Sequence, residues 1–134
     1  MRTIKFRAQV MFPEGGIVLS CDKAEGECVY GDLHLQSRIP HIHSLGKKYP
    51  INPDTVGQFT GLYDKDGKEI YEGDIILEKL KRSRKDGDLH EIVFEDCQWF
   101  GKNKDGAATS LSLLNDFHVI KIIGNIYDNP ELLK

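Results

Sequence analysis

The scarcity of helix-favouring residues constrains the fold of this chain most. Its 134 residues include 19 Val and Ile but only four Ala, and 13 Gly, several of them in Asp-Gly or Gly-Asp pairs. β-Branched residues pack well on a pleated sheet, and Gly supplies the positive φ that tight turns need. Turn signals recur about every ten residues, which predicts short strands at regular spacing. We therefore expect a mainly β fold, either a small barrel or strongly bent antiparallel sheets, with little helix.

Length and charge narrow the class of protein. A chain of 134 residues has the length of one domain and can bury enough surface to fold without metals or disulfides. No apolar run approaches the roughly 18 residues of a membrane-spanning helix, and the opening MRTIKFR is not followed by the apolar core of a signal peptide. We expect a single domain, residues 1–134, in the cytoplasm, where its three cysteines would remain thiols.

Strand patterns in the N-terminal half are short. Ile4, Phe6, Ala8 and Val10 alternate with polar residues, which predicts a first strand at about residues 2–11. Further strands are predicted at 17–21, 28–35 and 38–43. Residues 44–55 show little periodicity, so we expect a mobile connecting loop there.

The C-terminal half has clearer signals. Strands are predicted at residues 56–62 and 70–71 around the turn DKDG, and residues 74–81 are expected to pair with 89–95 in a hairpin. Phe94, Trp99 and Phe100 are expected to fill the core, and residues 101–107 to turn the chain again. The apolar segment 117–126 contains Gly124, which suggests a bulge or a close backbone approach.

Two short segments near the C-terminus are candidates for helix. Residues 110–115 are too short to decide between strand and helix. Asn129-Pro130-Glu131 has the composition of a helix start, but so few residues follow that we expect a single helical turn.

Three segments carry a resemblance to a known family. They are residues 4–8 (IKFRA), 57–76 (GQFTGLYDKDGKEIYEGDII) and 123–133 (IGNIYDNPELL), and in this order they resemble the signature of the YopX-like family of phage and prophage proteins. Residues 11–55 match poorly, so the signature lies in residues 56–134. The resemblance implies a mainly β fold, a bacterial or phage origin and no established enzymatic activity. It supplies no catalytic residues.

A zinc site can be drawn from the histidines and cysteines of the N-terminal half. His41 and His43 would share one face of a strand, and Cys21, Cys28 and His34 are near in sequence. The cysteines are seven residues apart, which does not match the close pairs of structural zinc sites. We therefore favour surface histidines and core cysteines, with no metal.

Asp64, Asp66 and Gly67 also resemble the beginning of a calcium-binding loop. With Gly67 at the sixth position, the first and twelfth positions would be Leu62 and Gly73, which lack the carboxylates required there. We interpret the segment as a turn.

Motifs for catalysis are missing. The sequence contains no Gly-x-Ser-x-Gly elbow, phosphate-binding loop or His-Glu-x-x-His motif, and many carboxylates fall in predicted turns. We therefore expect a protein that is not an enzyme and has no cofactor.

One charged segment stands out. Residues 79–85 contain five basic residues, and the rest of the chain has 13 basic and 21 acidic residues, a formal charge of −8. On a projecting hairpin the segment could bind nucleic acid phosphates. Alternatively, its charges could prevent edge strands from pairing with neighbouring molecules. We favour the second interpretation, because no aromatic residue interleaves the basic residues, as would be expected of a single-strand binder. The candidate nucleic-acid ligands are Lys79, Lys81, Arg82, Arg84 and Lys85.

Two functional hypotheses follow. The first is a phage-encoded interaction or adaptor module that acts through its β surface on a protein partner or on a second copy of itself. The second is an accessory nucleic-acid-binding protein that uses the basic segment.

Overall fold

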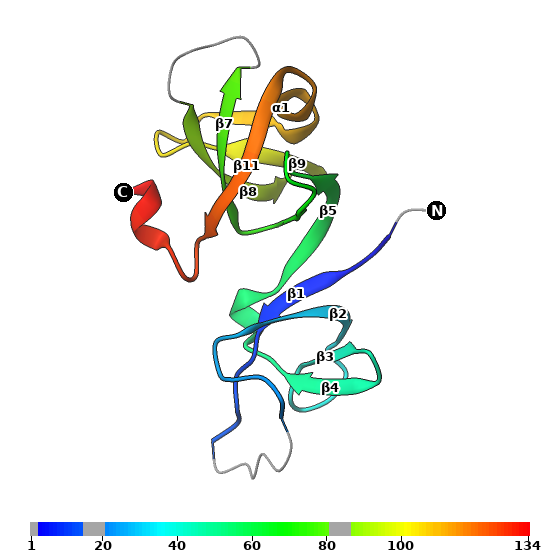
Figure 1. Cartoon of the computed structure of the whole chain (residues 1–134). Helices are drawn as coiled ribbons and strands as arrows, with labels where there is room; N and C mark the ends of the chain where they lie inside the picture. Colours follow the sequence, from blue (N-terminus) through cyan, green and yellow to red (C-terminus); the bar gives the residue numbers. More distant parts are fainter. Residues whose placement is uncertain (1–2, 15–20, 81–86) are drawn as a thin grey trace. The chain divides into compact units, whose positions relative to one another are not determined.

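The computed structural model describes residues 3–14, 21–80 and 87–134, and within these ranges it is mainly β with little helix, as predicted (Figure 1). Its contacts divide the chain into two compact units, residues 1–59 and 60–134. The boundary falls inside strand β5 (Gly57–Tyr63). Strand β5 therefore has residues in both units. The single-domain organisation stays a prediction, which an unfolding measurement can test.

The N-terminal unit is built on one antiparallel sheet. Its elements are β1 (Phe6–Gln9), β2 (Cys28–His34), β3 (His41–Ser44), β4 (Lys47–Pro50) and the 3-10 helix η1 (Pro53–Thr55). The strands lie in the order β4-β3-β2-β1-β5. Alternate residues face a small core, whose buried members are Ala8, Val10, Val29, Ile42, Tyr49 and Ile51.

Three predictions for this unit need correction. The first strand is shorter than residues 2–11, and the strand expected at 38–43 lies at 41–44. The loop expected at 44–55 is wrong: Leu45 and Gly46 have φ of 49° and 79° and make the tight turn into β4, whose Tyr49 is buried. Tyr49 is the single buried residue of this four-residue strand, which gives too weak a pattern to detect. The strand predicted at 17–21 lies, apart from Cys21, outside the described residues.

The C-terminal unit contains a second antiparallel sheet. Its elements are β6 (Glu69–Tyr71), β7 (Asp74–Leu80), β8 (Asp88–Glu95), β9 (Gln98–Lys102), β10 (Ala108–Ser110), α1 (Leu111–Phe117), β11 (His118–Asn125) and the 3-10 helix η2 (Pro130–Leu133). The sheet has the order β10-β9-β8-β7-β11, and β6 pairs with β5. In the described part of the chain, β10 and β11 are therefore edges, so the sheets are bent but open and the barrel alternative is wrong.

Helix α1 covers the core of this unit. The undecided segment 110–115 is mostly helical, because Leu111 and Leu114 lie three residues apart and both enter the core. The other buried members of this core are Ile70, Ile76, Ile92 and Ile120.

Further predictions for the C-terminal unit are confirmed. The hairpin of residues 74–81 with 89–95 forms as β7 and β8, and the C-terminal turn forms as η2. The β7–β11 register shifts between Ile122 and Gly124, where a Cβ atom would come within 2.5 Å of Asn129 Oδ1. The bulge, one of the two alternatives predicted at Gly124, is therefore present, and the atoms that approach the glycine belong to the Asn129 side chain. Gly101 belongs to β9, so the turn expected at 101–107 begins later, at Asn103.

The turn after β5 is held by one buried carboxylate. Asp64 is 7% exposed and accepts backbone N–H groups from Asp66 (2.9 Å), Lys68 (2.9 Å) and Ile122 (3.2 Å). Burial raises the pKa of this carboxyl, but the hydrogen bonds from Lys68, Ile122 and Asp66 outweigh burial and leave the pKa below its ordinary value. The Lys65 N–H also donates to the Ile120 carbonyl (2.9 Å). The turn therefore covers part of the outer edge of β11, and the turn interpretation of this segment is confirmed.

Candidate functional site

The basic segment connects two paired strands. Lys79 is exposed near the end of β7, opposite Val119 of β11. Glu78 of β7 pairs with Asp88 of β8, so the chain between these strands closes the β7–β8 hairpin. The four other candidate ligands lie outside the described residues: Lys81, Arg82, Arg84 and Lys85.

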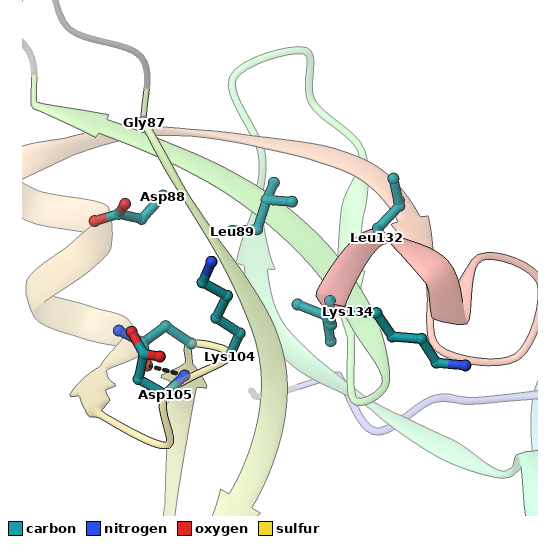
Figure 2. Close-up of a pocket in the computed structure, with 9 residues that line it drawn as sticks. Gly87, Asp88, Leu89, Lys104, Asp105, Leu132 and Lys134 are labelled. Carbon is teal, nitrogen blue, oxygen red and sulfur yellow. Dashed lines mark hydrogen bonds between the residues drawn. The ribbon is translucent and has the colours of Figure 1, made fainter.

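A pocket of about 230 Å³ lies at the beginning of β8, beside the β9–β10 turn and η2 (Figure 2). Its apolar wall consists of Leu89, Leu132 and Leu133. The charged groups around it come in opposite signs: Asp88, Asp105, Lys104 and Lys134.

One polar side chain of this pocket bonds to the backbone of the adjacent turn. Asn103 Oδ1 accepts from the backbone N–H groups of Asp105 (3.0 Å) and Ala107 (2.9 Å). The Asn103 side chain therefore stabilises the backbone of the β9–β10 turn. The residues that line this pocket include no Ser, Thr, Cys or His. Ligand pockets usually measure roughly 300–1,000 Å³. This hollow is smaller, with room for one or two side chains of a partner.

A second hollow lies against the single tryptophan of the chain. It measures about 280 Å³, and its lining is uncharged: Thr60, Leu62, Gln98, Trp99, Ser110, Leu111 and Ser112. Phe94 is the cross-strand partner of Trp99, and their ring centroids are 4.7 Å apart at 55°. Because Phe94 is 50% exposed, part of this aromatic pair faces solvent.

The turn beside the aromatic pair has an unusual backbone. Asp96 and Cys97 have φ of 50° and 61°, although neither is glycine. Residues in this region cost free energy and tend to occur at functional sites. The turn sets the register that places Phe94 opposite Trp99.

Sequence reasoning placed this pair in the core, and for Phe94 that prediction is wrong. Trp99 packs partly against the core, but Phe94 lies two residues beyond the last core position of β8, Ile92. The signal that identifies the site is two apolar strand segments separated by Asp96-Cys97, the spacing of a two-residue hairpin.

The residues of the zinc hypothesis separate into two groups. His34 lies opposite His41 in the β2–β3 register and stacks on His43, with ring centroids 3.7 Å apart and planes 17° from parallel. Cys21 packs against the N-terminal core, and Cys28 is half-buried at the beginning of β2. Among the described residues, no group of three or more His, Cys, Asp or Glu could hold a metal ion.

A buried polar pair lies apart from both pockets. His90 of β8 is 4% exposed, and its Nε2 is 3.4 Å from Glu78 Oε1. A Cβ atom on Gly101 would come within 2.7 Å of Leu114 Cδ1 and 3.1 Å of His90 Cβ, so the glycine makes room for the imidazole beneath α1. The pair lines neither hollow.

No helix in the described ranges has the length and hydropathy needed to cross a membrane.

Comparison with known proteins identifies the family. None of the curated proteins matches the chain. The crystal structure of protein EF1440 from Enterococcus faecalis is similar to it, with 26% identity over 100% of both chains and a TM-score of 0.49. The sequence model described as YopX protein matches residues 15–134, which is most of the chain. The resemblance predicted from the three sequence segments is thus confirmed, and the chain belongs to the YopX protein family.

Proposed function

We propose that this YopX protein is a phage- or prophage-encoded accessory protein that acts in the bacterial cytoplasm as an interaction or adaptor module and not as an enzyme. Two features support the proposal. The chain belongs to the YopX family, and neither described pocket contains a paired nucleophile and base. Its partner is a bacterial or phage protein, or a second copy of the chain.

The observation that carries this proposal is the half-exposed Phe94 against Trp99. Aromatic residues dominate binding hot spots because they bury a large area and lose little side-chain entropy. Here Trp99, the partner of Phe94, lines an uncharged hollow in a chain of which 29% is charged. An apolar side chain of a partner can enter this hollow without removing a charge from water. We call Phe94, Trp99 and the hollow the aromatic site.

The sheet edges favour contact through side chains over addition of a strand. Edge β4 carries Lys47, Lys48 and Pro50, residue types that discourage pairing. Edge β10 has only three residues, and on edge β11 the Ile120 carbonyl and Ile122 N–H already bond to the turn at Asp64 and Lys65. We therefore expect partners to bind at the aromatic site.

The test compares proteins recovered from a host lysate by the wild type, Phe94→Ser and a control, Leu35→Ser, whose side chain is also exposed but lies in the other unit. Proteins that bind the aromatic site are retained by the control and lost with Phe94→Ser. Because the chain has one tryptophan, adding the purified partner should also shift the emission of Trp99 to shorter wavelength. Light scattering tests self-association in the same variants. Identical recovery by all three proteins, with a monomer throughout, would contradict the proposal.

Nucleic-acid binding by the basic segment is the second candidate. The observation in its favour is that Lys79 is exposed where β7 and β8 lead into the segment. Arg82→Glu with Arg84→Glu should weaken binding, and the affinity of the wild type should fall steeply with salt. A wild-type protein that gives no mobility shift with DNA or RNA at low salt would end this alternative.

A further inference from the structure

Three histidines gather on one side of the N-terminal sheet. Along β2 and β3 the side chains alternate between the buried core and the opposite face, with Ile42 at the core. The opposite face carries a group that we call the histidine face: Asp32, His34, His41, His43 and Lys48.

The geometry brings these groups together from three strands. His34 of β2 lies opposite His41 of β3, and Asp32 lies opposite His43. Lys48 of β4 is the register partner of His43 on the other side. His34 and Lys48 are exposed, and His41 and His43 are half-buried. The stack of His34 on His43 therefore forms a ring platform beside a lysine.

The charge of this face depends on pH. Burial lowers the pKa of His41, and Lys48 and His34 lower it further. Burial, His34 and Lys48 also lower the pKa of His43, against an opposite effect of Asp32. These histidines are therefore neutral at pH 7 and gain positive charge on acidification, while Asp32 is the single carboxylate of the face.

Further polar and charged residues lie next to the face. Ser37 Oγ is 3.3 Å from His41 Nδ1 in the β2–β3 connection, which also carries the exposed Arg38. On β1, Arg7 is the register partner of Tyr30, whose ring is 43% exposed. Because Arg7 is itself buried, the surroundings add one exposed cation, Arg38, and one exposed aromatic residue, Tyr30.

We propose that the histidine face binds single-stranded nucleic acid, with an affinity that increases as the pH falls below neutrality. Phosphates would bind Lys48 and the protonated imidazoles, and bases would stack on the histidine rings. Single-stranded nucleic acid carries both phosphates, which match the cationic groups of this face, and flat bases, which match its histidine rings. A duplex presents phosphates but hides its bases, so it uses only one of these two features. This site is distinct from both the aromatic site and the basic segment.

Salt dependence gives the size of the expected effect. Each phosphate that a single strand contacts through a cation contributes about 0.7 to the slope of log affinity against log salt. Acidification adds positive charge to the histidine face, so the slope should steepen between about pH 7.5 and about pH 5.5, by about 0.7 for each imidazole that gains a charge and contacts a phosphate. The affinity itself should rise at least about tenfold at low salt over the same interval.

The experiment measures anisotropy of a fluorescent oligothymidylate of about 12 nucleotides, with full-length protein at both pH values. The variants are His34→Gln with His43→Gln, and Arg82→Glu with Arg84→Glu as a control for the basic segment. We expect the histidine variant to lose the acid-dependent part of binding and the control to retain it. Glutamine keeps a polar side chain of similar size, and circular dichroism of each variant at both pH values checks folding.

Three outcomes would overturn the proposal. They are no binding by the wild type at about pH 5.5, an unchanged pH dependence in the folded histidine variant, and loss of the acid-dependent binding in the control. Equal affinity for a duplex of the same length would show that the rings play no part, which also contradicts a single-strand site. None of these results bears on the aromatic site, because Phe94 is unchanged in every protein used.

Discussion

Replacing Asp64 by Asn tests the account of the β5–β6 turn. The carboxylate accepts three backbone N–H groups, two at Oδ1 and one, from Ile122, at Oδ2. An asparagine oxygen can keep the first two bonds. Its NH₂ group would then face the Ile122 N–H, so one charge-assisted bond is lost and a donor meets a donor.

The expected cost follows from these contacts. A hydrogen bond to a charged group contributes about 1.5–3 kcal/mol, and neutralising the side chain also weakens the two bonds that remain. We expect Asp64→Asn to reduce the free energy of unfolding by about 3 kcal/mol at neutral pH. For a chain of this length, the midpoint of thermal unfolding should fall by about 10 °C.

The effect should depend on pH in a defined direction. The folded pKa of Asp64 lies below the ordinary value of 3.8, so the unfolded chain takes up the proton first as the pH falls. The stabilisation is therefore complete above about pH 5 and declines as the pH falls through 3.8 toward the folded pKa. The difference between wild type and Asp64→Asn should shrink accordingly at about pH 3.

Urea unfolding at several pH values is the assay, with Asp66→Asn as the matched control. Asp66 is an exposed aspartate in the same turn, and its substitution should change stability by no more than about 0.5 kcal/mol. Equal stability of Asp64→Asn and wild type at neutral pH would refute the reasoning. So would a destabilisation that stays constant down to about pH 3.

Two further predictions concern packing and cooperativity. Gly101→Ala should cost about 1–3 kcal/mol by urea unfolding, because its Cβ would meet Leu114 Cδ1 at 2.7 Å. Leu114→Ala should cost less in that background than in the wild type, and strictly additive effects would show that the two sites do not touch. Calorimetry of the full chain should show one transition, because β5 pairs with β1 of the N-terminal unit and with β6 of the C-terminal unit, so unfolding of one unit removes a strand partner from the other. Two separate transitions would contradict the single-domain prediction.

The fold class followed from local chemistry. Positive φ at Gly67 marks the turn expected at DKDG, and Gly124 lies at the predicted bulge. The β7–β8 hairpin forms as predicted because the short apolar run Ile75-Ile76-Leu77 directly follows the turn residues Gly73 and Asp74. Such features depend on neighbours a few residues away, which the sequence displays directly.

Elements decided by distant contacts were missed. Strand β4 is stabilised by Tyr49 in a core with residues from β1 and β2, and the pattern of residues 47–50 alone does not show this burial. Helix α1 is short, and its two core leucines fit a strand almost as well as a helix until the facing sheet is known.

The candidate sites divide in the same way. Composition identified the basic segment, because five charges in seven residues need no tertiary information. The aromatic site depends on where the core of the C-terminal unit ends. The core includes Ile92, whereas Phe94, two residues later, is half exposed.

The sequence by itself determined the mainly β class, the turns and the family of this protein, because turn geometry, residue periodicity and the family segments are properties of neighbouring residues. Only the tertiary structure decided the openness of the sheets, the exposure of Phe94 and the gathering of His34, His41 and His43. These depend on which strands pair and in which register. A one-residue change in register would turn each side chain to the other face of its sheet.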